Sequence, residues 1–156
     1  MKSIGKLISS IVVSLLAGGT GSIFTVANIP GWYEHLQKSP LNPPNWVFGP
    51  VWTTLYILMG IALYLVWVAP GKKRAKQLAY GAFFAQLLLN VLWSVVFFGM
   101  HSLWGGAAVI GCLFLAAAIT AILFKTFSRP AAWLFAPYIA WICFATYLNV
   151  SVAVLN

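Results

Sequence analysis

Five apolar runs, each near the length that crosses a lipid bilayer, constrain this chain more than any other feature. They cover residues 7–27, 47–68, 79–99, 105–124 and 132–154, with bounds good to a few residues. About 20 apolar residues in a helix span the hydrocarbon core, and a backbone in lipid must satisfy its own hydrogen bonds. The runs therefore predict an all-α membrane protein, a single domain over residues 1–156 built as a bundle of five transmembrane helices.

The composition supports a surface that is covered by lipid. Charged residues make up 6% of the chain, whereas an ordinary soluble domain carries about 25%. Water could not solvate so uncharged a surface, so the lipid bilayer is the expected surrounding. The net charge of +8 comes from cations in short gaps between the apolar runs rather than on one polar face. That placement argues against nucleic-acid binding.

The same cations predict the orientation of the bundle. With the N-terminus inside, eight of the nine Lys and Arg residues fall on the inner side and only Lys38 falls outside. The inner cations are Lys2, Lys6, Lys72, Lys73, Arg74, Lys76, Lys125 and Arg129. Because Lys and Arg accumulate on the side that is not translocated, we expect the N-terminus inside and the C-terminus outside.

Most conventional catalytic arrangements are absent from the sequence. Glu34 is the only carboxylate, which excludes paired catalytic acids, a Ser-His-Asp triad and a carboxylate proton relay in the membrane. The two His and two Cys residues lack metal-ligand spacing, so no metal site is predicted. His35 as an axial ligand of a porphyrin metal is the weaker alternative.

Polar and aromatic side chains lie inside the apolar runs, where they are costly. Gln86, Asn90 and Trp93 have the spacing i, i+4, i+7, so they share one helix face that should point into the bundle. Interhelical hydrogen bonds and ligand contact are both open explanations. A second stripe comprises Tyr138, Trp141, Ala145 and Asn149, and a third comprises Trp52, Tyr56, Met59, Leu63 and Trp67.

Two proline features bear on the same region. Pro137 removes the backbone donor for the Trp133 carbonyl, so we expect a kink there, and kinks in membrane helices border cavities. The one long loop, residues 28–46, carries four prolines together with Trp32 and Tyr33. We expect an ordered outer loop that caps the bundle as a lid. Eight Trp residues in the chain favour a large, flat, apolar ligand.

Small residues four apart predict close helix contacts. The pairs are Ser14 with Gly18, Ala17 with Gly21, Gly81 with Ala85, and Ala107 with Gly111. Such pairs let backbones approach within a bundle or between two copies of a chain. A homodimer is therefore one alternative, and the pattern does not say which face would form it.

Three blocks of the sequence together resemble one known family. Residues 32–56 read WYEHLQKSPLNPPNWVFGPVWTTLY, residues 86–93 read QLLLNVLW and are followed by Phe97-Phe98-Gly99, and residues 137–149 carry Pro137, Tyr138, Trp141 and Asn149. This order, across nearly the whole chain, is similar to the tryptophan-rich sensory protein family, which includes the mitochondrial translocator protein, also called the peripheral benzodiazepine receptor.

The resemblance implies a five-helix bundle that binds porphyrins such as protoporphyrin IX, and isoquinoline carboxamide drugs. Bacterial members of the family promote light-dependent oxidative breakdown of protoporphyrin IX. By this resemblance Trp52 and Trp141 would be the catalytic pair. The ligand-binding positions would be Tyr33, Pro43, Trp52, Asn90, Trp93, Trp141 and Ala145. No cofactor would be required beyond the bound tetrapyrrole itself.

Three points stay open after the resemblance. Whether the activity is enzymatic is undecided, because light and oxygen do much of the chemistry. A carrier of porphyrins or other apolar molecules and a stress-sensing regulator are the alternative functions. The cholesterol motif of mammalian members lacks its Tyr and Arg in residues 148–156, and such motifs are weak. The chain is therefore more similar to the bacterial branch, and we expect a multi-pass protein of the bacterial cell membrane.

Overall fold

The structure, a computed structural model, describes residues 2–156 and within them contains helices and no strand. Its elements are α1 (Lys2–Asn28), η1 (Tyr33–His35), α2 (Asn45–Val68), α3 (Lys73–Ser94), η2 (Val95–Gly99), α4 (Leu103–Lys125), α5 (Arg129–Trp133) and α6 (Ala136–Leu155). The turn η1 is 3-10 helical, and η2 is a π-helical continuation of α3. Within these described residues, five helical segments are long and apolar enough to cross a membrane, which confirms the predicted five-helix class.

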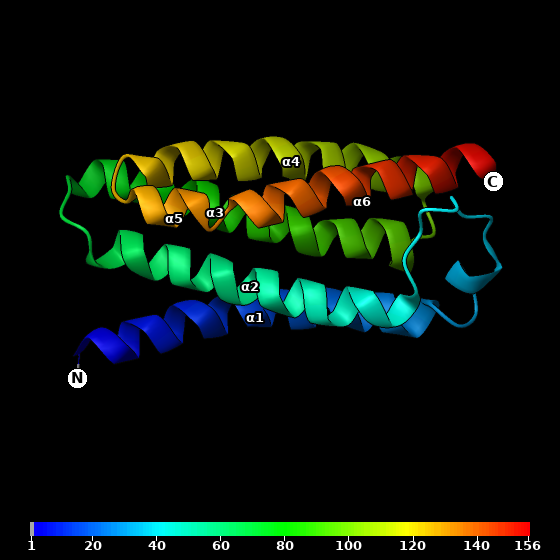
Figure 1. Ribbon diagram of the computed structural model, residues 1–156, viewed down its shortest axis with the longest axis horizontal. Coiled ribbons are helices and arrows are strands. Elements are labelled where there is room, and N and C mark those ends of the chain that lie inside the picture. The colour runs from blue at the N-terminus through cyan, green and yellow to red at the C-terminus, as the bar shows by residue number, and fades with distance from the viewer. Residues whose placement is uncertain (1) are drawn as a thin grey trace.

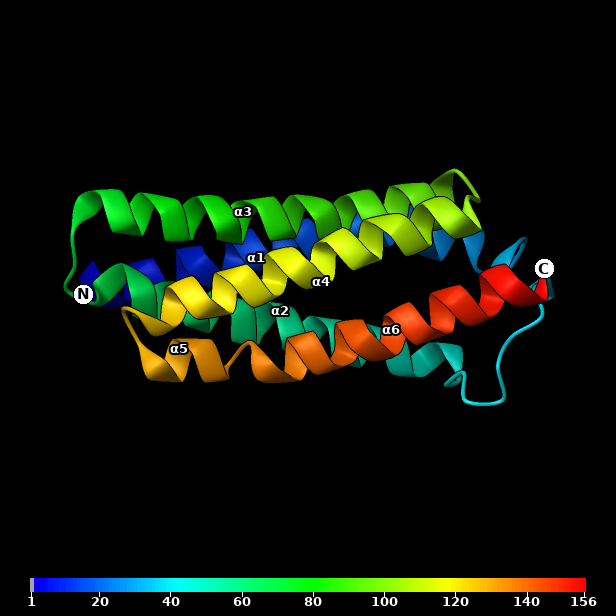
Figure 2. The ribbon, with the colours of Figure 1, turned by 90° about the horizontal axis from the view of Figure 1, so that it is seen from above.

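The helices lie lengthwise beside one another in an elongated bundle (Figures 1 and 2). α1 packs against α2 and α3, α3 packs against α4, α4 packs against α6, and α5 packs against α2. Around the bundle the order is therefore α1, α2, α5 with α6, α4 and α3. This order places α1 on the flank that joins α2 to α3.

Charge is distributed unequally between the two ends of the bundle. The N-terminus lies at the same end as the α2–α3 and α4–α5 connections, and most of the cations lie at this end, in the connections or in the helix turns beside them (Figures 1 and 2). The long loop, which carries Lys38, lies at the opposite end, and so does the C-terminus (Figure 1). Of the eight cations predicted inside, the Lys2 side chain lies outside the described part of the structure. Which end faces the cell interior stays a prediction, and on that basis the loop end is called the outer end.

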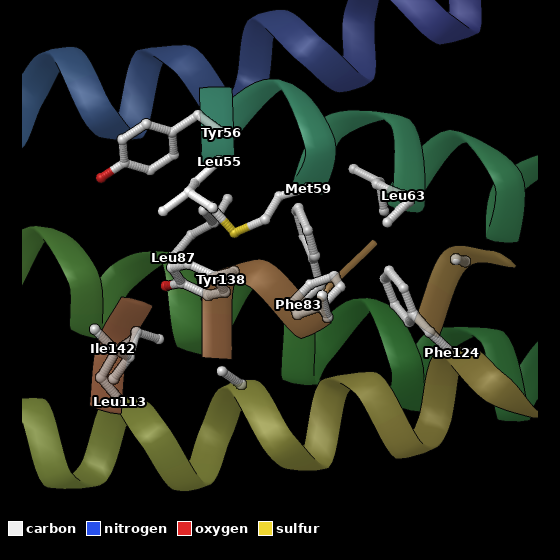
Figure 3. Close-up of a cluster of buried hydrophobic side chains, with 14 of the residues drawn as sticks. Leu55, Tyr56, Met59, Leu63, Phe83, Leu87, Leu113, Phe124, Tyr138 and Ile142 are labelled. Carbon is white, nitrogen blue, oxygen red and sulfur yellow. The ribbon is translucent and has the colours of Figure 1, made fainter. Parts of the chain in front are cut away.

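A densely packed cluster fills the inner half of the bundle, between α2, α3, α4 and α6 (Figure 3). Phe83 stacks on Phe124 with ring centroids 5.7 Å apart, and Phe135 meets Phe124 edge-on at 5.5 Å. All three side chains are completely buried. Because lipid is as apolar as these side chains, close packing rather than removal of surface from water holds such helices together.

Small residues explain how closely α1 approaches its neighbours. A Cβ on Gly18 would lie 2.3 Å from the Tyr56 ring, and a Cβ on Gly21 would lie 3.0 Å from the Ser94 hydroxyl oxygen. The predicted contacts at these two glycines are therefore contacts of α1 with α2 and α3. Around Gly81 and Gly111, by contrast, no described atom lies within 4 Å of an added Cβ. Those positions face away from the bundle, and dimerisation through them stays a prediction.

The chain breaks where a kink was predicted. α5 ends at Trp133, Leu134 and Phe135 form a turn, and α6 begins at Ala136. Pro137 thus occupies the first turn of α6, where its missing N–H costs no intrahelical hydrogen bond. The kink predicted at Pro137 is therefore a break between α5 and α6, because the proline starts a helix instead of bending one, while the predicted span over residues 132–154 lies within the apolar segment Arg129–Leu155.

Candidate ligand-binding site

The outer half of the bundle encloses a cavity of about 510 Å³. Its wall comes from α1, α2, the end of α3 with η2, and α6, and Tyr33 of the long loop closes it from above. The wall is mostly apolar, and none of the described residues that line it carries a charged side chain. Its volume falls within the roughly 300–1,000 Å³ that is usual for small-molecule sites.

Five of the seven predicted ligand-binding residues line this cavity. They are Tyr33, Trp52, Asn90, Trp93 and Ala145. The other two, Pro43 and Trp141, are not part of the wall. The Pro43 carbonyl accepts a hydrogen bond from Asn42 Nδ2 at 3.0 Å within the loop. The structure thus brings most of the predicted site together, while the binding role of each residue stays a prediction.

Trp141 lies behind Trp52 as seen from the cavity. Its ring meets Trp52 edge-on with centroids 6.5 Å apart, and it also packs against Phe48 at 6.0 Å and Phe144 at 5.6 Å. Its Nε1 atom is buried and has no hydrogen-bond partner among the described residues. A molecule in the cavity would therefore contact Trp52 directly, whereas Trp141 would contact Trp52 and not the molecule itself.

Trp52 is the centre of a layer of aromatic rings. Besides Trp141, its neighbours are Tyr56 at 5.8 Å, Trp93 at 6.1 Å and Tyr138 at 6.3 Å between centroids. Each such pair stabilises the packing by about 0.5–1.5 kcal/mol beyond its buried area. The layer fixes the orientation of the Trp52 ring, so the cavity is given a rigid aromatic wall.

Buried polar side chains form one network beneath the cavity. The Tyr56 hydroxyl donates to Asn90 Oδ1, and Asn90 Nδ2 donates to the Tyr138 hydroxyl at 3.1 Å. The Tyr138 hydroxyl donates to Gln86 Oε1 at 2.8 Å, and Gln86 Nε2 approaches Met59 Sδ at 3.6 Å. Gln86 therefore serves interhelical hydrogen bonding, as one of the two open explanations proposed. Asn90 does both, because it joins this network and also lines the cavity.

The indole N–H of Trp93 is likewise occupied within the protein. Trp93 Nε1 donates to Asn149 Oδ1 at 3.0 Å, and Asn149 Nδ2 donates to the Leu103 carbonyl at 2.9 Å. The Trp93 ring stacks on Phe97 with centroids 5.8 Å apart. Since the donors of Asn90 and Trp93 are engaged, the wall offers ring faces and apolar surface more than free hydrogen bonds.

The long loop packs across the outer end of the bundle on the side of α3 and α4. Trp32 stacks on His101 with centroids 4.3 Å apart and meets Phe97 edge-on at 5.5 Å. The buried Tyr33 donates its hydroxyl to Asn42 Oδ1 at 2.9 Å. Burial raises the pKa of the Tyr33 phenol, and the hydrogen bond to Asn42 opposes part of that rise. The phenol therefore stays a neutral donor at physiological pH.

The other side of the loop is tied to α6. The Gln37 N–H donates to Asn156 Oδ1 at 3.0 Å, and Asn156 Nδ2 donates to the Gln37 carbonyl at 2.9 Å. The hydroxyls of Ser39 and Tyr147 share a hydrogen bond of 2.8 Å. Lys38 Nζ lies 4.8 Å from the Tyr33 ring centroid. These ties hold the loop above the cavity, where a lid would have to be.

The mouth of the cavity lies on the flank of the bundle, between α1 and α2. Seven wall residues are exposed, and all belong to these two helices: Gly19, Ser22, Val26, Asn45, Trp46, Gly49 and Thr53. In a membrane this flank faces lipid. The predicted pocket drew on residues 47–68, 79–99 and 132–154 and on Tyr33 and Pro43 of the long loop, so the part played by α1 was missed. The run of small residues 17–22 was the signal that could have revealed it.

The π-helical turn η2 was also missed. It places Phe97 and Phe98 in the cavity wall. Such turns shift side-chain directions within a helix and are frequent at functional sites. Apolar spacing alone carries no sign of this shift, although Gly99 marks the end of the turn. A Cβ on Gly99 would lie 3.0 Å from the Phe24 ring of α1.

No group of three or more His, Cys, Asp or Glu side chains is placed to hold a metal ion within residues 2–156. His35 is exposed on the loop, away from the cavity wall. Cys112 and Cys143 are both free and exposed. The chemistry open to the cavity is therefore that of aromatic rings, hydroxyls and amides.

Comparison with known proteins gives one consistent result. The sequence profile of the TspO/MBR family matches residues 10–155. Tryptophan-rich protein TspO of Archaeoglobus fulgidus is 40% identical over 151 residues, which are 97% of each chain. Tryptophan-rich protein TspO of Chlorobaculum tepidum is 40% identical over 155 residues, 99% of this chain and 98% of the relative. Translocator protein of Homo sapiens is 42% identical over 132 residues, 83% of this chain and 77% of the relative.

Proposed function

Because the chain belongs to the TspO/MBR family, a family of multi-pass integral membrane proteins, we propose that it binds a porphyrin in its membrane cavity and promotes the light-dependent oxidative degradation of protoporphyrin IX. The observation that carries this proposal is the cavity wall itself. Trp52, Trp93 and Phe97 present ring surfaces to a space of about 510 Å³ that no charged side chain lines within the described residues. A flat, apolar macrocycle is complementary to such a wall.

The chemistry follows from what the wall can supply. Protoporphyrin is the substrate, and light and dioxygen provide the energy and the oxidant, so the protein needs no resident cofactor. Trp52 is the wall residue best placed to exchange an electron with an excited macrocycle, because its ring is held rigidly by four aromatic neighbours. Enclosure excludes water from the reacting pair and keeps their geometry constant. Isoquinoline carboxamides would compete for the same wall.

The test is illumination of purified protein with protoporphyrin IX in lipid nanodiscs, followed by porphyrin fluorescence. Trp52→Phe and Trp141→Phe should each slow product formation while porphyrin binding in the dark is retained. Trp133→Phe is the matched control, because Trp133 is 76% exposed and lies outside the cavity wall. If Trp52→Phe and Trp141→Phe both leave product formation unchanged, the proposed roles of these tryptophans are wrong.

A carrier of porphyrins is the second candidate, favoured by the mouth between α1 and α2. A ligand could pass from the bilayer into the cavity through this opening without crossing the loop. The discriminating measurement is flux of protoporphyrin IX into sealed vesicles in the dark. Protein-dependent flux with an unchanged porphyrin spectrum would support the carrier, whereas spectral loss on illumination would support degradation.

A further inference from the structure

The position of Trp141 leads to an inference that rests on the proposed function. A side chain that contributes to photochemistry from outside the cavity wall must act through another side chain. Trp141 contacts Trp52 edge-on, with ring centroids 6.5 Å apart and an angle of 88° between the ring planes. Trp52 in turn lines the cavity. An electron can therefore reach the cavity from Trp141 through a single aromatic contact.

The aromatic contacts continue from Trp141 towards the outer surface. Trp141, Phe144 and Tyr147 are three residues apart on α6, a spacing that makes successive side chains neighbours on a helix. The centroid distances are 5.6 Å from Trp141 to Phe144 and 6.4 Å from Phe144 to Tyr147, and the last two rings are nearly parallel at 19°. Tyr147 is 46% exposed. The four rings thus connect the cavity with the surface beneath the loop.

Tyr147 differs from the other tyrosines near the aromatic layer in what can happen to its proton. A phenol that gives up an electron becomes a strong acid and must release its proton. The hydroxyls of Tyr56 and Tyr138 donate into the buried network, and that of Tyr33 is buried against Asn42. The Tyr147 hydroxyl instead shares its hydrogen bond with Ser39 of the long loop, at the outer end of the bundle where the loop meets water. Its proton can leave to water.

We propose that Trp52, Trp141, Phe144 and Tyr147 form a one-electron path from the cavity to the surface, with Tyr147 as its outer end. The excited porphyrin takes one electron from Trp52 and passes it to dioxygen, which becomes superoxide, and this reduced dioxygen is the oxidant that attacks the macrocycle. Trp141 returns an electron to Trp52, and Tyr147 returns one to Trp141 through the Phe144 ring while its phenolic proton goes to water. A soluble one-electron reductant such as ascorbate then restores Tyr147, with a proton taken from water.

The path has a consequence that can be measured. Each electron that Tyr147 supplies removes an oxidised state from the two tryptophans before dioxygen products can add to their indoles. Without the phenol, the oxidised state would remain on Trp52 and Trp141. The protein would then damage itself after fewer porphyrins had been degraded.

The experiment compares wild type with Tyr147→Phe in nanodiscs loaded with protoporphyrin IX and supplied with dioxygen and ascorbate. Tyr147→Phe should degrade severalfold fewer porphyrins per protein before activity ends, and mass spectrometry should find added oxygen on Trp52 and Trp141. Ser39→Ala is the matched control, because it removes the same hydrogen bond to the loop and keeps the phenol. Tyr64→Phe removes a phenol that is hydrogen-bonded to Ser3 at the other end of the bundle. Both controls should behave as wild type.

A second readout does not depend on degradation. A light flash on bound protoporphyrin, with methyl viologen as electron acceptor, should produce a tyrosyl radical in wild type that Tyr147→Phe abolishes. The path is overturned if wild type forms no tyrosyl radical, if Tyr147→Phe leaves both the radical and the indole oxidation unchanged, or if Ser39→Ala reproduces the loss. A wild type that forms the radical but leaves porphyrin intact would refute the proposed degradation and leave the path standing.

Discussion

Both halves of this bundle contain aromatic side chains, but in the inner half they form a packed core and in the outer half they form the wall of a cavity. In the inner half, Phe83, Phe124 and Phe135 are completely buried and belong to one packed cluster between α2, α3, α4 and α6 (Figure 3). In the outer half, Trp52 and Trp93 are only partly buried, and their rings border an open cavity. Aromatic content alone therefore does not make a binding site. What differs is whether neighbouring helices cover both faces of each ring.

The position of α1 accounts for much of this difference. Near its N-terminal half, the backbone of Ile11 approaches Gly60 of α2 so closely that an added Cβ would lie 2.5 Å from the Ile11 Cα. Further along, α1 presents the small residues Gly18, Gly19 and Ser22 to the cavity. α1 thus closes against α2 in one half, and in the other half it leaves the space that the cavity occupies.

The largest expected effect concerns the inner half. Phe83→Ala should lower the free energy of unfolding by about 3–5 kcal/mol, because it removes a fully buried ring from a packed cluster. Thermal unfolding in detergent, compared with the exposed neighbour variant Phe84→Ala, measures it. Phe84 is 50% exposed and should tolerate the change far better. Equal destabilisation by the two variants would show that the inner half is not the better packed one.

A smaller effect is expected where α1 borders the cavity. Gly18→Ala should lower stability by about 1–3 kcal/mol and weaken porphyrin binding, because the new methyl group would collide with the Tyr56 ring and disturb its hydrogen bond to Asn90. Gly19→Ala, one residue further on, meets no described atom within 4 Å. It should be neutral or stabilising by about 0.5–1 kcal/mol, since Ala favours a helix over Gly. Calorimetry measures the stability of the two variants, and porphyrin titration measures their binding. Equal porphyrin binding by the two variants would contradict the predicted role of Gly18.

Some features of the two halves could be predicted from the sequence, and others could not. The five spans follow from apolar length, and the inward face of Gln86, Asn90 and Trp93 follows from helical spacing, since polar groups are costly in lipid. That Trp141 lies outside the cavity wall could not be predicted in this way. In a helix of 3.6 residues per turn, two side chains four residues apart point in directions that differ by about 40°. Trp141 and Asn149 therefore lie at opposite edges of one predicted stripe, and only Asn149 lines the cavity.

The contribution of α1 and the π-helical turn could not be predicted for other reasons. Glycine and serine carry little hydrophobic signal, so the small residues of α1 suggested close packing and gave no hint of a cavity. The turn η2 depends on a local change of backbone hydrogen bonding, which residue identity at Phe97 and Phe98 does not disclose. Both features depend on how whole helices are placed relative to one another, and this placement is determined by many contacts together rather than by any short stretch of sequence.

The smallest expected effect concerns the two routes into the cavity, the loop above it and the mouth beside it. Asn156→Ala removes both hydrogen bonds that tie Gln37 to α6, each of which contributes about 0.5–1.5 kcal/mol. Amide hydrogen exchange in residues 32–42 should accelerate by roughly tenfold, whereas exchange elsewhere should not change. Gln77→Ala, an exposed amide at the opposite end of the bundle, is the control. Because the mouth lies between α1 and α2, porphyrin dissociation should keep its rate although the loop has loosened. A dissociation rate that rises in step with loop exchange would instead place the ligand's route at the loop, and the lipid-facing mouth would then not be the way in.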